Sequence, residues 1–204
     1  MITEIYGMIG VFLAVGIVVC IRRFVPDHGL PEEVKVPAIV FFFLSSAILQ
    51  TEDVVTTTLL LVFISYLSAS AYTDYYSRYV YSLFSIVVGI AGYLYVVLNV
   101  SWNDLKQMLI FCLVILAAHF IKAYASGDVE VFIVSIPFVY MLARRMELPV
   151  LELLLFFFVL SVCLTLLWAL LRLAVKRKKE KQVAMVPAIH GAACVLLILE
   201  MMIK

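Results

Sequence analysis

Charged side chains are scarce in this chain of 204 residues, at 14% of the total. That is about half the share found in an ordinary soluble domain. Hydrophobic residues make up 66%, and the mean hydropathy is +1.14. A soluble domain of this size leaves much of its chain in contact with water and could not bury so much apolar surface. The composition therefore excludes an ordinary soluble domain and indicates a single membrane domain.

The sequence also lacks closely spaced cysteine pairs and the basic N-terminal segment of a cleaved signal peptide. The four cysteines stand singly in apolar stretches with no Cys-x-x-Cys spacing, so neither a zinc site nor a disulfide framework is expected. We expect no metal, no cofactor and no nucleic-acid partner. The first residues, Met1–Glu4, contain no Lys or Arg, and we expect the first apolar run to be a retained span.

Eight apolar runs are separated by short polar connections. They occupy residues 5–21, 37–50, 54–72, 79–98, 105–121, 129–143, 150–175 and 183–203. A membrane-spanning helix needs about 20 residues, so runs 37–50 and 129–143 are short. Each could be a tilted span, a re-entrant segment or a helix beside a wet cavity. The pattern predicts an all-α, polytopic transmembrane bundle of about eight spans, with an N-terminal helical hairpin at 1–53 and a six-helix core at 54–204.

Basic residues are distributed unequally between the two sets of connections. If all eight runs span, the odd-numbered connections carry eleven Lys and Arg, and the even-numbered side carries four. The first set is Arg22, Arg23, Lys35, Arg78, Lys122, Arg172, Lys176, Arg177, Lys178, Lys179 and Lys181, and the second is Lys106, Arg144, Arg145 and Lys204. Because basic connections stay in the cytoplasm, we expect the odd connections to be cytoplasmic. The predicted location is the inner (plasma) membrane.

Two aspartates stand where the chain enters or leaves the membrane on the predicted cytoplasmic side. Asp74 ends the third run, and Asp128 begins the sixth. Two carboxylates that share a site cannot both ionise easily, so one can act as an acid while the other activates water as a base. Two such carboxyl groups are the catalytic groups that an aspartyl peptidase needs. Read singly, Asp74 could be a solvated helix end beside Arg78, and Asp128 a helix cap.

The surrounding residues resemble a known family. Asp74-x-x-x-Arg78-x-Val80-Tyr81-Ser82 is similar to the first-aspartate motif of type IV prepilin peptidases, Ala125-Ser126-Gly127-Asp128 to their Gly-x-Gly-Asp motif, and residues 183–192 to their proline-containing last helix. The similarity covers about 54–203 and is greatest to short forms without the cysteine-rich cytoplasmic loop. It implies a metal-independent endopeptidase that cleaves the basic leader from a pilin-like precursor, with Asp74 and Asp128 as the catalytic pair.

The sequence departs from the family motifs at several positions. Ala125 replaces a glycine, Tyr81 and Ser82 replace a Pro-Asn step, and Glu130 stands where a lysine is common. Arg78, Gly127 and Glu130 are expected to bind substrate or to modulate the pair, Glu130 by raising an aspartate pKa or altering leader recognition. The missing cysteine-rich loop argues against the family's second activity, N-methylation.

Two other functions stay open at this point. A presenilin-like intramembrane protease also uses Gly-x-Gly-Asp, although it places its first aspartate inside a helix. An inactive relative or a non-enzymatic component of a pilus or secretion assembly would need no cleavage at all. Two polar residues interrupt the last run. His190, which follows Pro187, is expected to pack or to bond where the proline frees a carbonyl, and Glu200 is expected to lie at the outer interface.

Overall fold

The computed structural model describes residues 2–25, 29–50, 53–121, 124–176 and 184–203. These residues form eight α-helices and no strand. The helices are α1 (Ile2–Phe24), α2 (Val36–Ala47), α3 (Val54–Ser77), α4 (Ser82–Asn99), α5 (Trp102–Phe120), α6 (Ser126–Arg145), α7 (Val150–Lys176) and α8 (Val186–Ile203). The predicted all-α bundle is confirmed. Lys122 and most of the basic cluster at 176–181 lie outside the described residues.

Seven of the eight helices are long and apolar enough to cross a membrane. They indicate a multi-pass membrane protein in a lipid bilayer. The exception is α2, which has 12 residues and begins with Pro37 in its first turn. Proline is favoured there because the first N–H groups of a helix have no partner within it. A straight helix of that length rises only about 18 Å, well short of the bilayer core.

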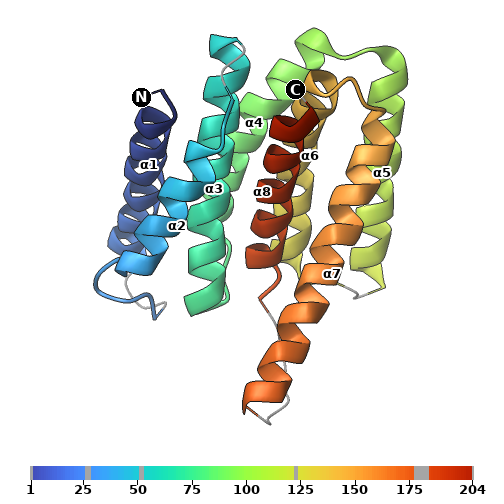
Figure 1. The fold of residues 1–204 in the computed structure, drawn as a ribbon. Coiled ribbons are helices and arrows are strands. Elements are labelled where there is room, and N and C mark those ends of the chain that lie inside the picture. Colours follow the sequence, from blue (N-terminus) through green and yellow to red (C-terminus); the bar gives the residue numbers. More distant parts are fainter. Residues whose placement is uncertain (1, 26–28, 51–52, 122–123, 177–183, 204) are drawn as a thin grey trace.

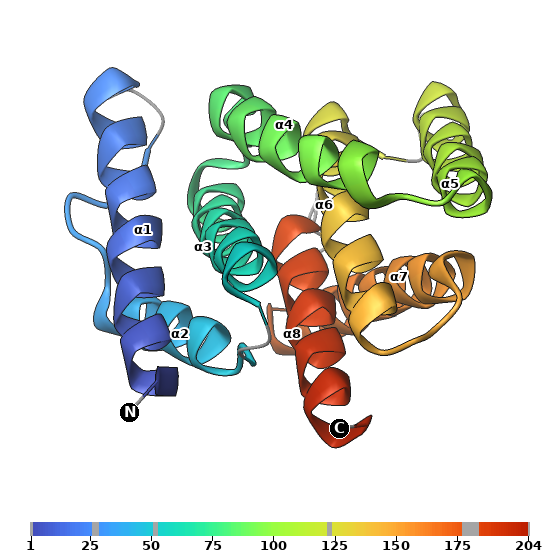
Figure 2. The same cartoon turned by 90° about the horizontal axis from the view of Figure 1, so that it is seen from above.

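The helices stand side by side around α3, α6 and α8 (Figure 1). Seen from above, α8 lies between α3 on one side and α6 and α7 on the other (Figure 2). The α1–α2 hairpin packs against α3, whereas α5 lies at the opposite edge of the bundle. Accordingly α3 and α6 are the most buried spans, and α4 and α5 are the most exposed to lipid.

The central helix α3 begins at an N-terminal cap. The Asp53 side chain accepts a hydrogen bond from the Thr56 N–H at 2.7 Å, which holds the pKa of the Asp53 carboxyl below its usual value. Farther along, Ser65 and Ser68 donate to carbonyls one turn earlier, at 2.7 and 2.8 Å. These bonds satisfy hydroxyls that the membrane interior would otherwise leave unpaired. Both serines are buried, so the polar side of α3 that carries them faces neighbouring helices rather than lipid.

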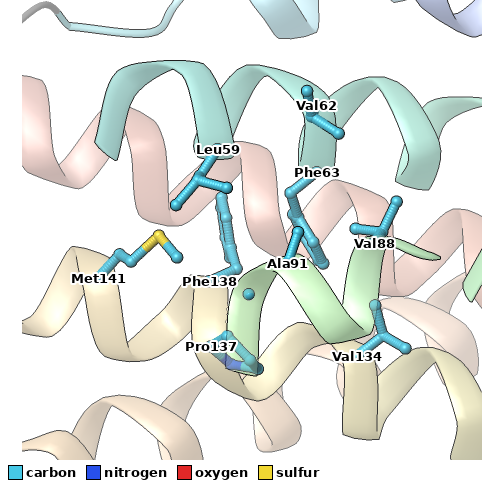
Figure 3. Close-up of a pocket in the computed structure, with 10 residues that line it drawn as sticks. Leu59, Val62, Phe63, Val88, Ala91, Val134, Pro137, Phe138 and Met141 are labelled. Atoms are coloured by element: carbon cyan, nitrogen blue, oxygen red, sulfur yellow. The ribbon is translucent and has the colours of Figure 1, made fainter. Parts of the chain in front are cut away.

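Close helix contacts hold the core together between α3, α4 and α6. Phe63 and Phe138 stack with ring centroids 4.5 Å apart, and Figure 3 shows them between α3 and α6. On the α4 side, a Cβ atom at Gly92 would lie 2.9 Å from the Pro137 Cβ. Glycine is needed there because the proline ring cannot move aside. At this crossing α4 lies directly against α6.

A buried ion pair closes the end of the bundle at which α6 and α8 end. Arg145 Nε lies 2.8 Å from Glu200 Oε1, and both side chains are almost completely buried. Arg145 also donates to the Gln50 carbonyl at 2.8 Å, which ties the connection after α2 to the core. Glu200 is therefore buried within the bundle, and its depth at the outer interface stays a prediction. A carboxylate can be buried at this position because it has a cationic partner.

His190 packs inside the bundle, which is one of the two outcomes predicted for it, and its hydrogen-bond partner is a side chain. Its Nε2 is 2.8 Å from Ser68 Oγ, and its ring lies 4.6 Å from Phe41. Ser45 Oγ is a further 3.4 Å from Ser68 Oγ. The result is a short polar chain that joins α8, α3 and α2.

Candidate active site

Asp74 and Asp128 lie at the same end of the bundle, here called the aspartate end, where α3 ends and α6 and α8 begin (Figure 1). Their carboxylates are close enough to interact electrostatically. Asp74 occupies the last turn of α3 and is 7% exposed, whereas Asp128 occupies the first turn of α6 and is half-buried. Two acidic groups from distant parts of the sequence thus meet at one site.

Asp74 is oriented by the start of another helix. Its Oδ2 accepts a hydrogen bond from the Val186 backbone N–H at 3.2 Å. Val186 is the first residue of α8, so this N–H has no partner within its own helix. The positive end of the α8 dipole also favours a negative charge there. The carboxylate is therefore held against α8 through one of its two oxygens.

Asp128 is oriented by its own helix. It stands three positions after the N-cap Ala125 and accepts a hydrogen bond from the Ala125 backbone N–H. This is the reciprocal half of a capping box, in which the third helical residue reaches back to the cap. Burial, and then the nearby Asp128, raise the pKa of Tyr124 in the preceding connection. The Tyr124 carbonyl in turn lies 3.1 Å from His119 Nδ1 at the end of α5.

The turn after α3 brings the two motifs into contact. Arg78 ends α3 in a left-handed conformation, with φ of 62°, and its N–H donates to the Asp74 carbonyl at 3.1 Å. This reverses the chain and carries Val80 toward α6. A Cβ atom at Gly127 would lie 3.2 Å from the Val80 Cγ2 atom, tighter than an ordinary contact. Gly127 thus lets the first motif approach the helix that carries Asp128.

Glu130 belongs to a different side of α6. Positions two apart on a helix do not face each other, so Glu130 and Asp128 point in different directions. The Ser82 hydroxyl, at the start of α4, donates to Glu130 Oε2 at 2.8 Å. Two of the departures from the family motifs are therefore bonded to each other, across α4 and α6. This placement separates Glu130 from the aspartate pair.

The backbone N–H of Val186 is the site component that the sequence did not reveal. A backbone donor carries no residue-type signal, although Pro187 marks the start of the helix that supplies it. Among the described residues, no cluster of His, Cys, Asp and Glu has the arrangement of a metal site.

Comparisons with protein-family models, with curated proteins and with solved structures found no match.

Proposed function

We propose that this protein is a membrane aspartyl endopeptidase of the prepilin peptidase kind, which removes the basic leader of a pilin-like precursor at the cytoplasmic face of the plasma membrane. The observation that carries the proposal is that Asp74 and Asp128 lie at the same end of an apolar helical bundle, within the range of electrostatic interaction. The order of the two motifs along the chain supports the same assignment.

The reaction needs one water molecule and two carboxyl groups. One carboxylate accepts a proton from the water, whose oxygen attacks the carbonyl carbon of the scissile peptide bond. The other carboxyl group donates its proton to the departing amide nitrogen as the C–N bond breaks. When the two carboxyl groups share one water, their mutual repulsion favours a state in which only one of them is ionised, which supplies both the acid and the base.

The membrane setting fits a substrate with a long apolar helix. Such a helix can remain in the bilayer beside the bundle while its leader junction stands at the surface. Asp74 and Asp128 lie at the helix ends rather than midway along the spans. A cut at the membrane surface suits a leader better than it suits the interior of a transmembrane segment.

A non-enzymatic role is the second candidate, and one contact favours it. The bond from the Val186 N–H to Asp74 is what a purely structural cap of α8 would show. In that case Asp74 would stabilise the bundle without any chemistry, and the protein would serve a pilus or secretion assembly as a scaffold.

Precursor cleavage distinguishes the two candidates. Membranes that contain the protein are incubated with a pilin-like precursor and EDTA, and the new amino terminus is identified by mass spectrometry. We expect a single cut between leader and apolar helix. If the precursor stays intact while deletion of the protein still disrupts assembly, the scaffold role replaces the peptidase.

A further inference from the structure

Two hydrogen bonds join α3 to α8 inside the bundle. At the aspartate end, the Val186 N–H of α8 donates to Asp74 Oδ2 at 3.2 Å. Farther from this end, His190 Nε2 of α8 lies 2.8 Å from Ser68 Oγ of α3. The two helices run in opposite directions (Figure 1). With a rise of about 1.5 Å per residue, the two contacts are about 9 Å apart along α3 and about 6 Å apart along α8.

The proton of the inner contact can be assigned from the neighbouring bonds. The Ser68 hydroxyl donates its one proton to the Ile64 carbonyl at 2.8 Å. Ser68 Oγ is therefore the acceptor toward His190, and the ring N–H that donates to it is on Nε2. The other ring nitrogen, Nδ1, is left as an acceptor, and the Cys194 Sγ lies 3.9 Å from it. A neutral histidine with one N–H satisfies this arrangement.

The inner contact is enclosed by protein on the side of α2. The His190 side chain is completely buried, and its ring centroid lies 4.6 Å from that of Phe41. Ser45 Oγ lies 3.4 Å from Ser68 Oγ. Helix α2 therefore packs against both partners of the contact, which keeps the histidine ring from turning away from Ser68.

Apolar packing alone would leave the axial position of α8 poorly defined. The buried residues next to His190 on α8 include Ile189, Ala192 and Ala193, and burial of such apolar surface has no preferred direction. A buried polar pair is different, because a slide of one helix along the other would leave both groups unpaired in an apolar interior. The same slide would carry the Val186 N–H away from Asp74.

We propose that His190 is a positioning residue, which fixes the register of α8 on α3 through Ser68 and thereby holds the Val186 N–H against the Asp74 carboxylate. His190 acts through α8 and does not touch the substrate. The meaning of this register for catalysis rests on the proposed peptidase function, because it orients the carboxylate that transfers the proton. A carboxylate that is out of position slows the chemical step.

Two matched pairs of variants test this role. Ser68→Ala removes the acceptor of His190. Ser65→Ala removes an equally buried serine of α3, which bonds to the Leu61 carbonyl of its own helix. His190→Gln keeps an amide N–H at about the position of Nε2, whereas His190→Asn is one methylene shorter and does not reach Ser68. Each pair therefore differs in the contact between the two helices and in little else.

Hydrogen exchange of the Val186 amide, followed by mass spectrometry in detergent, reports the geometry without any cleavage. Pro187 has no N–H, so a fragment that ends there reports Val186 without its neighbour. We expect Ser68→Ala and His190→Asn to speed this exchange at least about three-fold, the factor given by the usual strength of an interhelical hydrogen bond in a membrane. Ser65→Ala and His190→Gln should exchange like the wild type.

Precursor cleavage supplies the readout that a purely structural contact would not move. Ser68→Ala and His190→Asn should lower kcat at least about three-fold and leave KM unchanged, because only the orientation of the carboxylate is altered. His190→Gln should restore kcat, and Ser65→Ala should not lower it. For the exchange measurement, Asp74→Ala is the positive control, because it removes the acceptor of the Val186 N–H.

Two results would overturn the proposal. Exchange of the Val186 amide at the wild-type rate in Ser68→Ala and His190→Asn would show that the contact does not hold α8 in register. Equal losses of kcat in Ser65→Ala and Ser68→Ala would show a general effect of lost hydroxyls. If His190→Asn does not fold, Ser68→Ala alone decides. If the wild-type protein cleaves no precursor, the peptidase function fails, and the exchange measurement still decides whether His190 positions α8.

Discussion

Asp74 is proposed both to transfer a proton and to cap α8, and two substitutions at this position separate these roles. An asparagine side chain keeps an oxygen that can accept the Val186 N–H bond, but it cannot transfer a proton as a carboxyl group does. Asp74→Asn should therefore keep the thermal stability of the protein and lose cleavage. Asp74→Ala should lose cleavage and also about 1 kcal/mol of stability, the usual value of a helix cap.

Thermal unfolding in detergent, followed beside precursor processing, measures both effects. A purely structural Asp74 would give a different pattern, in which Asp74→Asn remains active and only Asp74→Ala is impaired.

Glu130 supplies the matched control for a carboxylate near the site. It is two residues from Asp128 but is bonded to Ser82 on the α4 side. Glu130→Gln should retain at least about half of the wild-type cleavage rate and the same dependence on pH, because it removes a charge that faces away from the pair. The initial rate of processing between pH 5 and 8 tests this. A shift of the optimum would restore the modulating role that its spacing in the sequence suggested.

The residues of the site could be predicted in part. The positions of Asp74 and Asp128 follow from where polar residues interrupt apolar runs, and Gly127 follows from its motif. The direction of Glu130 did not follow, because its bond to Ser82 on α4 cannot be read from its spacing in the motif. Val186 could not be found from its residue type, since it contributes only a backbone N–H.

At the scale of elements, the crossing of α4 and α6 depends on one glycine. Gly92 and Gly89 are both interior to α4, but an added methyl would meet the rigid Pro137 ring at 2.9 Å in one case and the Val134 Cγ2 at 3.5 Å in the other. Gly92→Ala should therefore be less stable than Gly89→Ala by about 1 to 3 kcal/mol, the usual range for overpacking.

Chemical denaturation in detergent compares the two variants directly. Both Gly→Ala substitutions gain the same helix propensity. The difference in stability between the two variants therefore measures the contact of the added methyl group with Pro137. Equal stability would mean that α4 does not lie against Pro137 as described.

The ion pair between α6 and α8 gives a second prediction at this scale. Glu200→Gln should lower stability by about 3 kcal/mol, because it leaves the buried Arg145 charge without its counter-ion. Glu152→Gln, at an exposed position on α7, is the control and should change stability by less than about 0.5 kcal/mol. Thermal melting of the two purified variants tests the difference, and similar melting points would contradict a buried pair.

Helix positions were largely predictable from hydropathy, and the deviations have a common cause. The apolar run 129–143 looked too short to span, yet α6 extends over Ser126–Arg145. The extra residues are the polar ones at its two ends, including Asp128 in the site and Arg145 in the ion pair. A hydropathy run stops where polar residues begin, whereas a helix continues through them when tertiary contacts satisfy their side chains. The short α2 lacks such extensions.

For the whole molecule, the basic residues predict an orientation in the membrane. Ser77 lies at the aspartate end and should face the cytoplasm, whereas Glu147, in the connection after α6, should face outside. Single cysteines at these positions, in a protein without its four native cysteines, should react oppositely with an impermeant maleimide added to intact cells. Labelling of Ser77→Cys from outside would reverse the orientation and place the aspartates away from a cytoplasmic leader.

The most direct test of the central claim is the rate of precursor cleavage by purified Asp74→Asn, Asp128→Asn and the double variant. The account predicts that each single substitution lowers the rate by at least about a thousand-fold, and that the double variant is no slower than either one. Residues that act as one catalytic unit give such non-additive losses. Cleavage by either single variant at close to the wild-type rate would contradict the assignment of the two aspartates as the catalytic pair.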